Sequence, residues 1–177
     1  MSTTRYHPLS IGLHWLMFLL FVAVYAAIEL KGFIPKGEPL RAQATSVHML
    51  CGQLILLFAC VRLLARWRFG APPVLGHSAA QRLAAHAGHL LLYLVMFVMP
   101  LTGIVFTQAG GREVTFFGLQ LPHLVAADPA LKASVKAFHE LVGNAVYFLI
   151  GIHVAAAVWH HVVLKDDTLR RMRPSSR

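Results

Sequence analysis

Histidines are the residues of this sequence whose type and spacing could do chemistry. The chain holds eleven of them, against seven aspartates and glutamates together. His139 and His153 are fourteen residues apart, which is about 21 Å and nearly four turns of an α-helix, and His160 follows after nearly two more turns. The three imidazoles therefore project from one face of one helix, at different depths.

This spacing predicts the ligation of haem. A histidine inside a membrane helix costs free energy unless it has a partner, so histidines in long apolar segments are candidates for function. A haem bound by imidazole on both faces takes one histidine from each of two facing helices. Two such pairs at different depths would carry electrons across a membrane.

Four long apolar stretches must position these histidines. Each is near the roughly 20 residues that a helix needs to cross about 30 Å of hydrocarbon. They run from about residue 11 to 28, 47 to 64, 83 to 106 and 138 to 164. Only 13% of the residues are charged, about half of the roughly 25% in ordinary soluble domains, which argues against a nucleic-acid-binding protein. The sequence predicts an all-α, integral membrane four-helix bundle that forms a single domain over residues 1–177.

The charges predict the orientation of this bundle. Four spans place both termini on one side, and that side has ten basic residues against two acids, whereas the other has six basic residues against five acids. By the positive-inside rule both termini are cytoplasmic. The cytoplasmic ten are Arg5, Arg62, Arg66, Arg68, Arg82, Lys165, Arg170, Arg171, Arg173 and Arg177, placed in the N-terminus, the loop after the second span and the C-terminal tail.

Depth in the membrane then suggests which histidines pair. His139 begins the fourth span at the outer side, where its partner within the membrane is His48 on the second span. His153 lies deeper, and its partner comes from the inner half, either His14 on the first span or His89 on the third. Depth alone leaves these two alternatives open. His160 would lie near the inner surface with whichever of the two is not used.

The segments around these histidines resemble the small bacterial di-haem cytochrome b561 family of the inner membrane, over nearly the whole chain. The matching segments are Ile11-Gly-Leu-His14-Trp15-Leu, Val47-His48-Met-Leu-Cys-Gly52, Ala85-His86-Ala-Gly-His89, Phe138-His139-Glu140 and Gly151-Ile-His153-Val-Ala-Ala-Ala157.

The resemblance implies both the cofactors and the activity. It implies two b-type haems, with His14 and His153 as ligands of the inner haem and His48 and His139 as ligands of the outer haem. It further implies that His89 and His160 line a ubiquinone site at the inner end. The activity that it implies is superoxide oxidation at the periplasmic side with reduction of ubiquinone, and no protein partner is required.

Two other functions fit a histidine-rich bundle of this kind. The first is a cytochrome b subunit that relays electrons from a partner dehydrogenase or hydrogenase to quinone. The second is a histidine-lined metal transporter, which is disfavoured because Glu29 and Glu140 both lie at outer ends of the spans and leave the membrane interior without carboxylates. Basic residues of the outer loops could attract the superoxide anion, provided that they form a local cluster. They are Lys31, Lys36, Arg41, Arg112, Lys132 and Lys136.

Overall fold

The computed structural model describes residues 5–76 and 78–173, and Arg177 of the cytoplasmic charge set lies outside them. This part of the chain forms four long helices, α1 (Pro8–Phe33), α2 (Pro39–Phe69), α3 (Ala79–Ala109) and α4 (Pro129–Val162). All four are long and apolar enough to cross a membrane. The predicted all-α, four-helix membrane fold is confirmed.

The helices begin where the local sequence satisfies their first N–H groups. Pro8, Pro39 and Pro129 each stand at the start of a helix, where a missing N–H costs nothing. Asp128 caps α4 by accepting hydrogen bonds from the N–H groups of Ala130 and Leu131 at 2.8 and 3.0 Å. These signals lie in polar sequence, so the helices extend beyond the apolar stretches.

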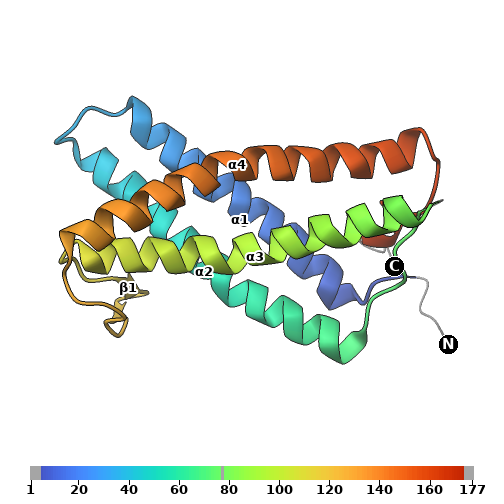
Figure 1. The fold of residues 1–177 in the computed structure, drawn as a ribbon, viewed down its shortest axis with the longest axis horizontal. Helices are drawn as coiled ribbons and strands as arrows, with labels where there is room; N and C mark the ends of the chain where they lie inside the picture. The colour runs from blue at the N-terminus through green and yellow to red at the C-terminus, as the bar shows by residue number, and fades with distance from the viewer. Residues whose placement is uncertain (1–4, 77, 174–177) are drawn as a thin grey trace.

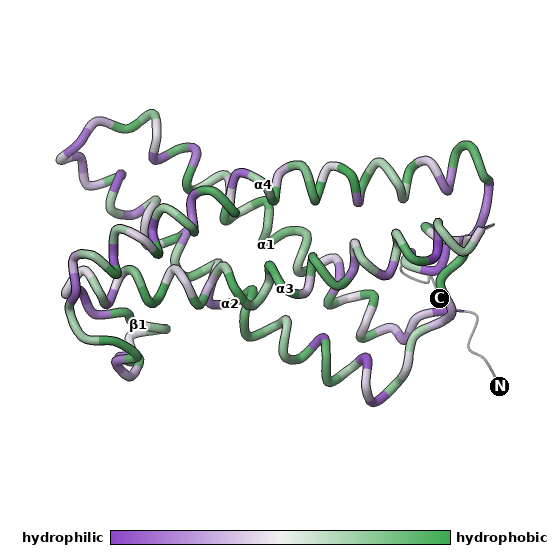
Figure 2. Tube along the Cα trace, viewed as in Figure 1, coloured by the Kyte–Doolittle hydropathy of each residue, from purple (hydrophilic) through white to green (hydrophobic). Residues whose placement is uncertain are grey.

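The four helices form two antiparallel hairpins that cross each other (Figure 1). The start of α1 and the end of α4 lie at one end of the bundle, and the α1–α2 turn and the α3–α4 connection lie at the other. Hydrophobic residues dominate the middle of the helices, and hydrophilic residues gather toward their ends (Figure 2). Large apolar side chains such as Leu19, Leu141 and Phe148 are more than half exposed, as expected for a surface that faces lipid.

The charged segments differ from the sequence prediction in their secondary structure. Arg62, Arg66 and Arg68 lie on the last turns of α2 and not in a loop, because α2 continues to Phe69. In the same way α4 begins at Pro129, before the apolar stretch that starts near residue 138, which shortens the loop between α3 and α4. That loop contains a small antiparallel pair of strands, β1 (Thr115–Phe116) and β2 (Leu119–Gln120).

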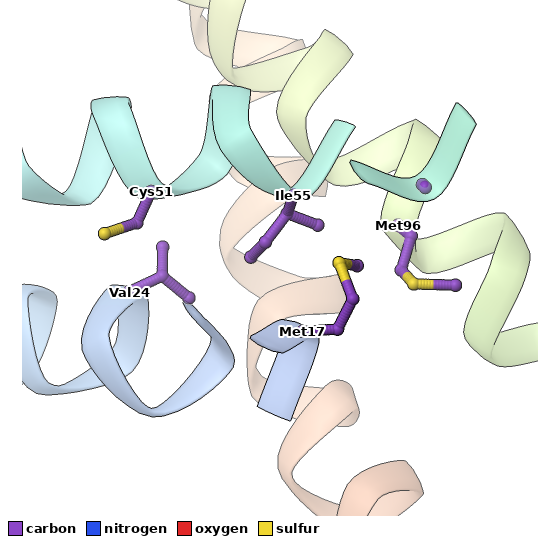
Figure 3. Packing of buried hydrophobic residues seen from close by; sticks show 6 residues of the cluster. Met17, Val24, Cys51, Ile55 and Met96 are labelled. Carbon is purple, nitrogen blue, oxygen red and sulfur yellow. The ribbon is translucent and has the colours of Figure 1, made fainter. Parts of the chain in front are cut away.

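The buried core lies between α1, α2 and α3. Met17 and Val24 of α1, Cys51 and Ile55 of α2, and Met96 of α3 pack together there (Figure 3). In contrast, α4 buries only Val146 among its described residues. Val146 lies on the histidine stripe, midway between His139 and His153, so the stripe is the face that α4 turns into the bundle.

Candidate haem and electron-transfer sites

The end of the bundle with the α1–α2 turn and the α3–α4 connection is the one predicted to face outward, and it is called the outer end below. The candidate site nearest to it joins His48 of α2 to His139 of α4. Their ring centres are 6.3 Å apart. An imidazole nitrogen binds a metal at about 2.0 Å, so two rings on opposite sides of one metal have centres roughly 6 Å apart. The separation of the two rings suits axial ligation of one iron.

In each of the two rings of the outer site, the Nδ1 atom forms a hydrogen bond that fixes the orientation of the ring. Nδ1 of His48 donates to the backbone carbonyl of Val24 on α1 at 2.9 Å. The hydroxyl of Thr102 on α3 donates to the carbonyl of Met99, so its oxygen accepts from Nδ1 of His139, also at 2.9 Å. Metal-binding histidines usually donate their second ring N–H in this way. The Nε2 atoms of both rings are left for a metal.

Two glycines give the outer site room. Gly52 follows His48 by one helical turn on the same face of α2, and a Cβ atom there would meet no atom within 4 Å. A Cβ atom at Gly103 of α3 would lie 3.5 Å from Cε1 of His139. A flat macrocycle needs such space beside its axial ligands, so the residues of the outer site fit a haem.

The inner candidate site contains three histidines in place of a simple pair. His153 of α4 lies 6.2 Å from His14 of α1 and 6.0 Å from His89 of α3, measured between ring centres. Both separations suit axial ligation, so distance leaves both partners open, as depth did. Among residues 5–76 and 78–173, no three histidine, cysteine or carboxylate side chains are arranged to hold a bare metal ion.

Arg62 is a fourth inner residue, which the sequence analysis counted only as a loop charge. Its Nε donates to the hydroxyl of Tyr93 on α3 at 3.2 Å, inside the bundle. The signal that could have found it is its spacing, because Arg62 follows His48 by the same fourteen residues that separate His139 from His153. The inner cluster thus takes a basic side chain from each of the four helices: His14, Arg62, His89 and His153.

His160 lies beyond this cluster at the end of α4 and pairs with an acid that the sequence analysis missed. Its Nδ1 donates to Asp166 at 2.5 Å, and the carboxylate also accepts the N–H of Thr168 at 2.8 Å. Partial burial raises the pKa of Asp166, but the hydrogen bonds from His160 and Thr168 outweigh it and hold the pKa below its ordinary value. In the described part of the chain no direct contact joins His160 to His89, whose ring lies against His153.

The segment after α4 folds across the inner end of the bundle. The indole N–H of Trp15 on α1 donates to the carbonyl of Met172 at 2.8 Å. Arg171 donates to the carbonyl of Pro73, between α2 and α3, at 3.0 Å. Together with the His160–Asp166 pair, these bonds tie the C-terminal segment to three parts of the bundle.

The outer end carries a local cluster of basic residues. The charge of Lys31 lies within electrostatic range of Arg41, Arg112 and Lys136, and also of His48. Lys136 is paired with Glu140 at 2.7 Å, but the two side chains are 50% and 59% exposed to solvent, so this pair is weak. Four of the six predicted basic residues, Lys31, Arg41, Arg112 and Lys136, therefore gather, together with the acid Glu140, and Lys31 connects this group to His48.

Comparison with known proteins decides the family. The family model described as prokaryotic cytochrome b561 matches residues 5–175. The chain belongs to the prokaryotic cytochrome b561 family. It is 38% identical to the probable superoxide oxidase CybB of Yersinia pestis over 174 residues, which are 98% of each chain. It is 36% identical to cytochrome b561 homolog 1 of Escherichia coli strain K12, over 96% of this chain and 97% of that protein.

Membership in the cytochrome b561 family confirms the resemblance seen in the sequence. A member of this family with four spanning helices is a multi-pass bacterial membrane protein that transfers electrons. The family is of the oxidoreductase type and implies haem b as cofactor. The histidine pairs described above are where this chain offers imidazoles for it.

Proposed function

We propose that the chain oxidises superoxide at its outer end and reduces ubiquinone at its inner end. Two superoxide anions each lose one electron and leave as dioxygen, and one ubiquinone gains two electrons and two protons. The observation that carries this proposal is the basic cluster around Lys31 beside the His48–His139 pair. The name of the relative from Yersinia pestis is consistent with it.

Two b-type haems, bound by His48 with His139 and by His14 with His153, would supply one-electron transfer between the two ends. Both pairs have the ring separation that axial ligation needs. Val24 and Thr102 fix the outer rings through Nδ1, which keeps each Nε2 directed to the metal. The protein would thus supply the ligands of the haems, set the distance between the two haems and control the access of substrates to them.

The basic cluster would bring the anionic substrate to the outer site. Charges of one sign around a cleft raise the rate of association with an oppositely charged molecule by about 10- to 1000-fold. Superoxide carries one negative charge, and the positive charges of Arg41 and Arg112 lie within electrostatic range of Lys31, which itself lies within range of His48. Its capture should therefore weaken as the salt concentration rises.

The inner end offers groups for a quinone and its protons. His160 has Nδ1 bound to Asp166, so its Nε2 is the atom available to a quinone oxygen. His89, which is not needed as a ligand when His14 is used, completes the proposed ubiquinone site. A carboxylate bound to the far nitrogen of an imidazole makes the ring a better proton relay.

The orientation and the domain organisation follow from the same proposal. The start of α1 and the end of α4 lie at the inner end, where α2 ends with Arg66 and Arg68 and Arg171 follows α4. We place this end in the cytoplasm, with the chain in the bacterial inner membrane as a single domain.

The test is a reduced-minus-oxidised spectrum of the purified chain with haem quantified per polypeptide, followed by superoxide pulses with and without ubiquinone. Two b-type haems and turnover that depends on quinone are expected. Two haems without turnover by the isolated chain would contradict the proposal and favour a subunit that takes electrons from a partner dehydrogenase or hydrogenase. A chain without haem would contradict both functions.

A further inference from the structure

Arg62 is placed within the membrane part of α2, on the side of the helix that carries His48. Fourteen residues separate the two, which is nearly four whole turns, so both side chains leave α2 in almost the same direction. Arg62 lies seven residues before the end of α2 at Phe69, about 10 Å along the helix axis. Its side chain is partly buried.

The guanidinium group is directed into the bundle and does not turn toward the cytoplasmic surface. Its Nε–H donates to the hydroxyl of Tyr93 at 3.2 Å, and its central carbon lies 6.0 Å from the centre of the Tyr93 ring. Tyr93 follows His89 by one turn of α3. The charge of Arg62 also lies within electrostatic range of His14 and His153. Arg62 is therefore part of the inner histidine cluster.

No acidic side chain of the described chain neutralises this charge. The seven acids of the sequence are all within the described residues, and none forms a salt bridge with Arg62. Asp166 and Asp167, the two at the inner end, bind His160 and Arg170. An arginine inside a membrane is costly unless it is paired, so Arg62 requires an anion that the polypeptide does not provide.

We propose that Arg62 binds a propionate carboxylate of the haem at the inner histidines, an inference that rests on the inner haem of the proposed function. A guanidinium group presents several N–H donors in a planar fork that matches a carboxylate, and Tyr93 occupies only one of them. The occupant must reach the level of His14 and His153 and carry an anionic oxygen. A ligated haem does both, because its propionates leave the edge of the same ring that the imidazoles hold.

The test compares the wild-type holoprotein with Arg62→Gln, Arg62→Lys and Arg66→Gln. Arg66 is the matched control, because it lies one turn further along the same side of α2 but is exposed. We would measure haem per polypeptide, the propionate bending band in resonance Raman spectra and the midpoint potentials of the two haems. Arg62→Gln should shift the propionate band and lower the midpoint of the inner haem alone, because an uncompensated carboxylate favours the ferric state. Arg66→Gln removes a charge of the same sign within electrostatic range of His89 but without contact to the site, so it should leave the propionate band unchanged.

A second comparison separates the two sources of an anionic oxygen at this site. The apoprotein is reconstituted with haem b or with its dimethyl ester, which has no free carboxylate. If Arg62 binds a propionate, Arg62→Gln should weaken the binding of haem b at the inner site, and this difference in affinity between wild type and Arg62→Gln should disappear with the ester. If the band and both midpoints stay unchanged in Arg62→Gln while the KM for ubiquinone rises, Arg62 serves the quinone and the proposal is wrong.

The remaining outcomes are also decisive. Should Arg62→Gln lose the inner haem, Arg62→Lys decides, because a charge without the fork must still shift the propionate band, and an unshifted band overturns the proposal. A wild-type chain with only one haem overturns both this proposal and the proposed function. Two haems without superoxide turnover overturn the proposed activity and leave the role of Arg62 to be judged on the spectra.

Discussion

Replacing Thr102 with valine removes one hydroxyl from the outer site and keeps the shape of the side chain. That hydroxyl donates to the carbonyl of Met99 and accepts the Nδ1–H of His139 at 2.9 Å. Valine removes this acceptor and leaves the carbonyl of Met99 as the remaining hydrogen-bond partner of the His139 ring. We expect weaker binding of the outer haem, and no change at the inner site.

The cost of a fully unsatisfied buried donor is the upper bound of the effect, because the carbonyl of Met99 remains within reach of the ring. Leaving such a group without its partner costs about 1 to 3 kcal/mol, which corresponds to a factor of about 5 to 150 in affinity. Loss of an outer-shell partner of a metal ligand typically costs 10- to 100-fold. The affinity for the outer haem should therefore fall by about one to two orders of magnitude.

The assay follows transfer of haem from the purified protein to an excess of apomyoglobin, with the two haems resolved by redox titration. The outer component is the one that His139→Ala removes. Thr107→Val is the matched control, because Thr107 lies on the same helix, is buried and donates only to the carbonyl of Gly103 at 2.7 Å. It should leave both haems unchanged.

Two results would refute this reasoning. One is an outer haem that Thr102→Val retains to within a factor of two. The other is an equal loss of haem from the Thr102 and Thr107 variants, which would indicate general damage to α3.

Four further predictions concern the other groups described above. His139→Ala and His153→Ala should each lose one haem and keep the other, as counted by pyridine haemochrome. His160→Ala should keep both haems and slow the reduction of ubiquinone in stopped-flow experiments. Lys31→Gln should lower the second-order rate constant with superoxide by roughly two- to five-fold and flatten its dependence on salt. Because the pKa of Asp166 is lowered in the folded protein, its stabilising contact is present above the ordinary aspartate value of about 4. The C-terminal segment should therefore open as the pH falls through the lowered pKa, measured by hydrogen exchange, and Asp166→Asn should be open already at neutral pH.

Each of these predictions has a result that contradicts it. Loss of haem in His160→Ala would make His160 an axial ligand and overturn the assignment of the inner site. A rate for Lys31→Gln equal to that of Lys36→Gln, a matched change outside the Lys31 cluster, would remove the case for electrostatic capture. Hydrogen exchange in the C-terminal segment that is the same for Asp166→Asn and wild type at neutral pH would show that the pair with His160 does not hold the segment.

The fold was predictable because the membrane leaves few alternatives to apolar helices. The four apolar stretches indicated where the helices are, but not where they end. Helices continue into polar sequence as long as their caps allow, and Pro129 with Asp128 starts α4 well before the apolar part. Hydropathy measures contact with lipid, and the length of a helix depends on the caps as well.

The candidate site was predictable along each helix and, from depth in the membrane, in the pairing of histidines between helices. Spacing on α4 indicated one face with His139 and His153, and the structure brings a second histidine to each. Contacts between helices could not be read from spacing, which is why Thr102, Tyr93 and the acid bound to His160 were missed. Spacing also could not decide whether His14 or His89 pairs with His153, because the rings of both lie at similar distances from the His153 ring.

The shared spacing of fourteen residues has a consequence for which changes in chain length this protein tolerates. One residue inserted between His139 and His153 would turn one of them about 100° away from the other. The same insertion in α2 would separate the directions of His48 and Arg62. Residues 117 and 118, at the tip between β1 and β2, carry no such register, so their number is free to vary without moving any of these groups. Insertions and deletions should therefore be accepted at that tip and eliminated from the two helices, even where single substitutions in the helices are harmless.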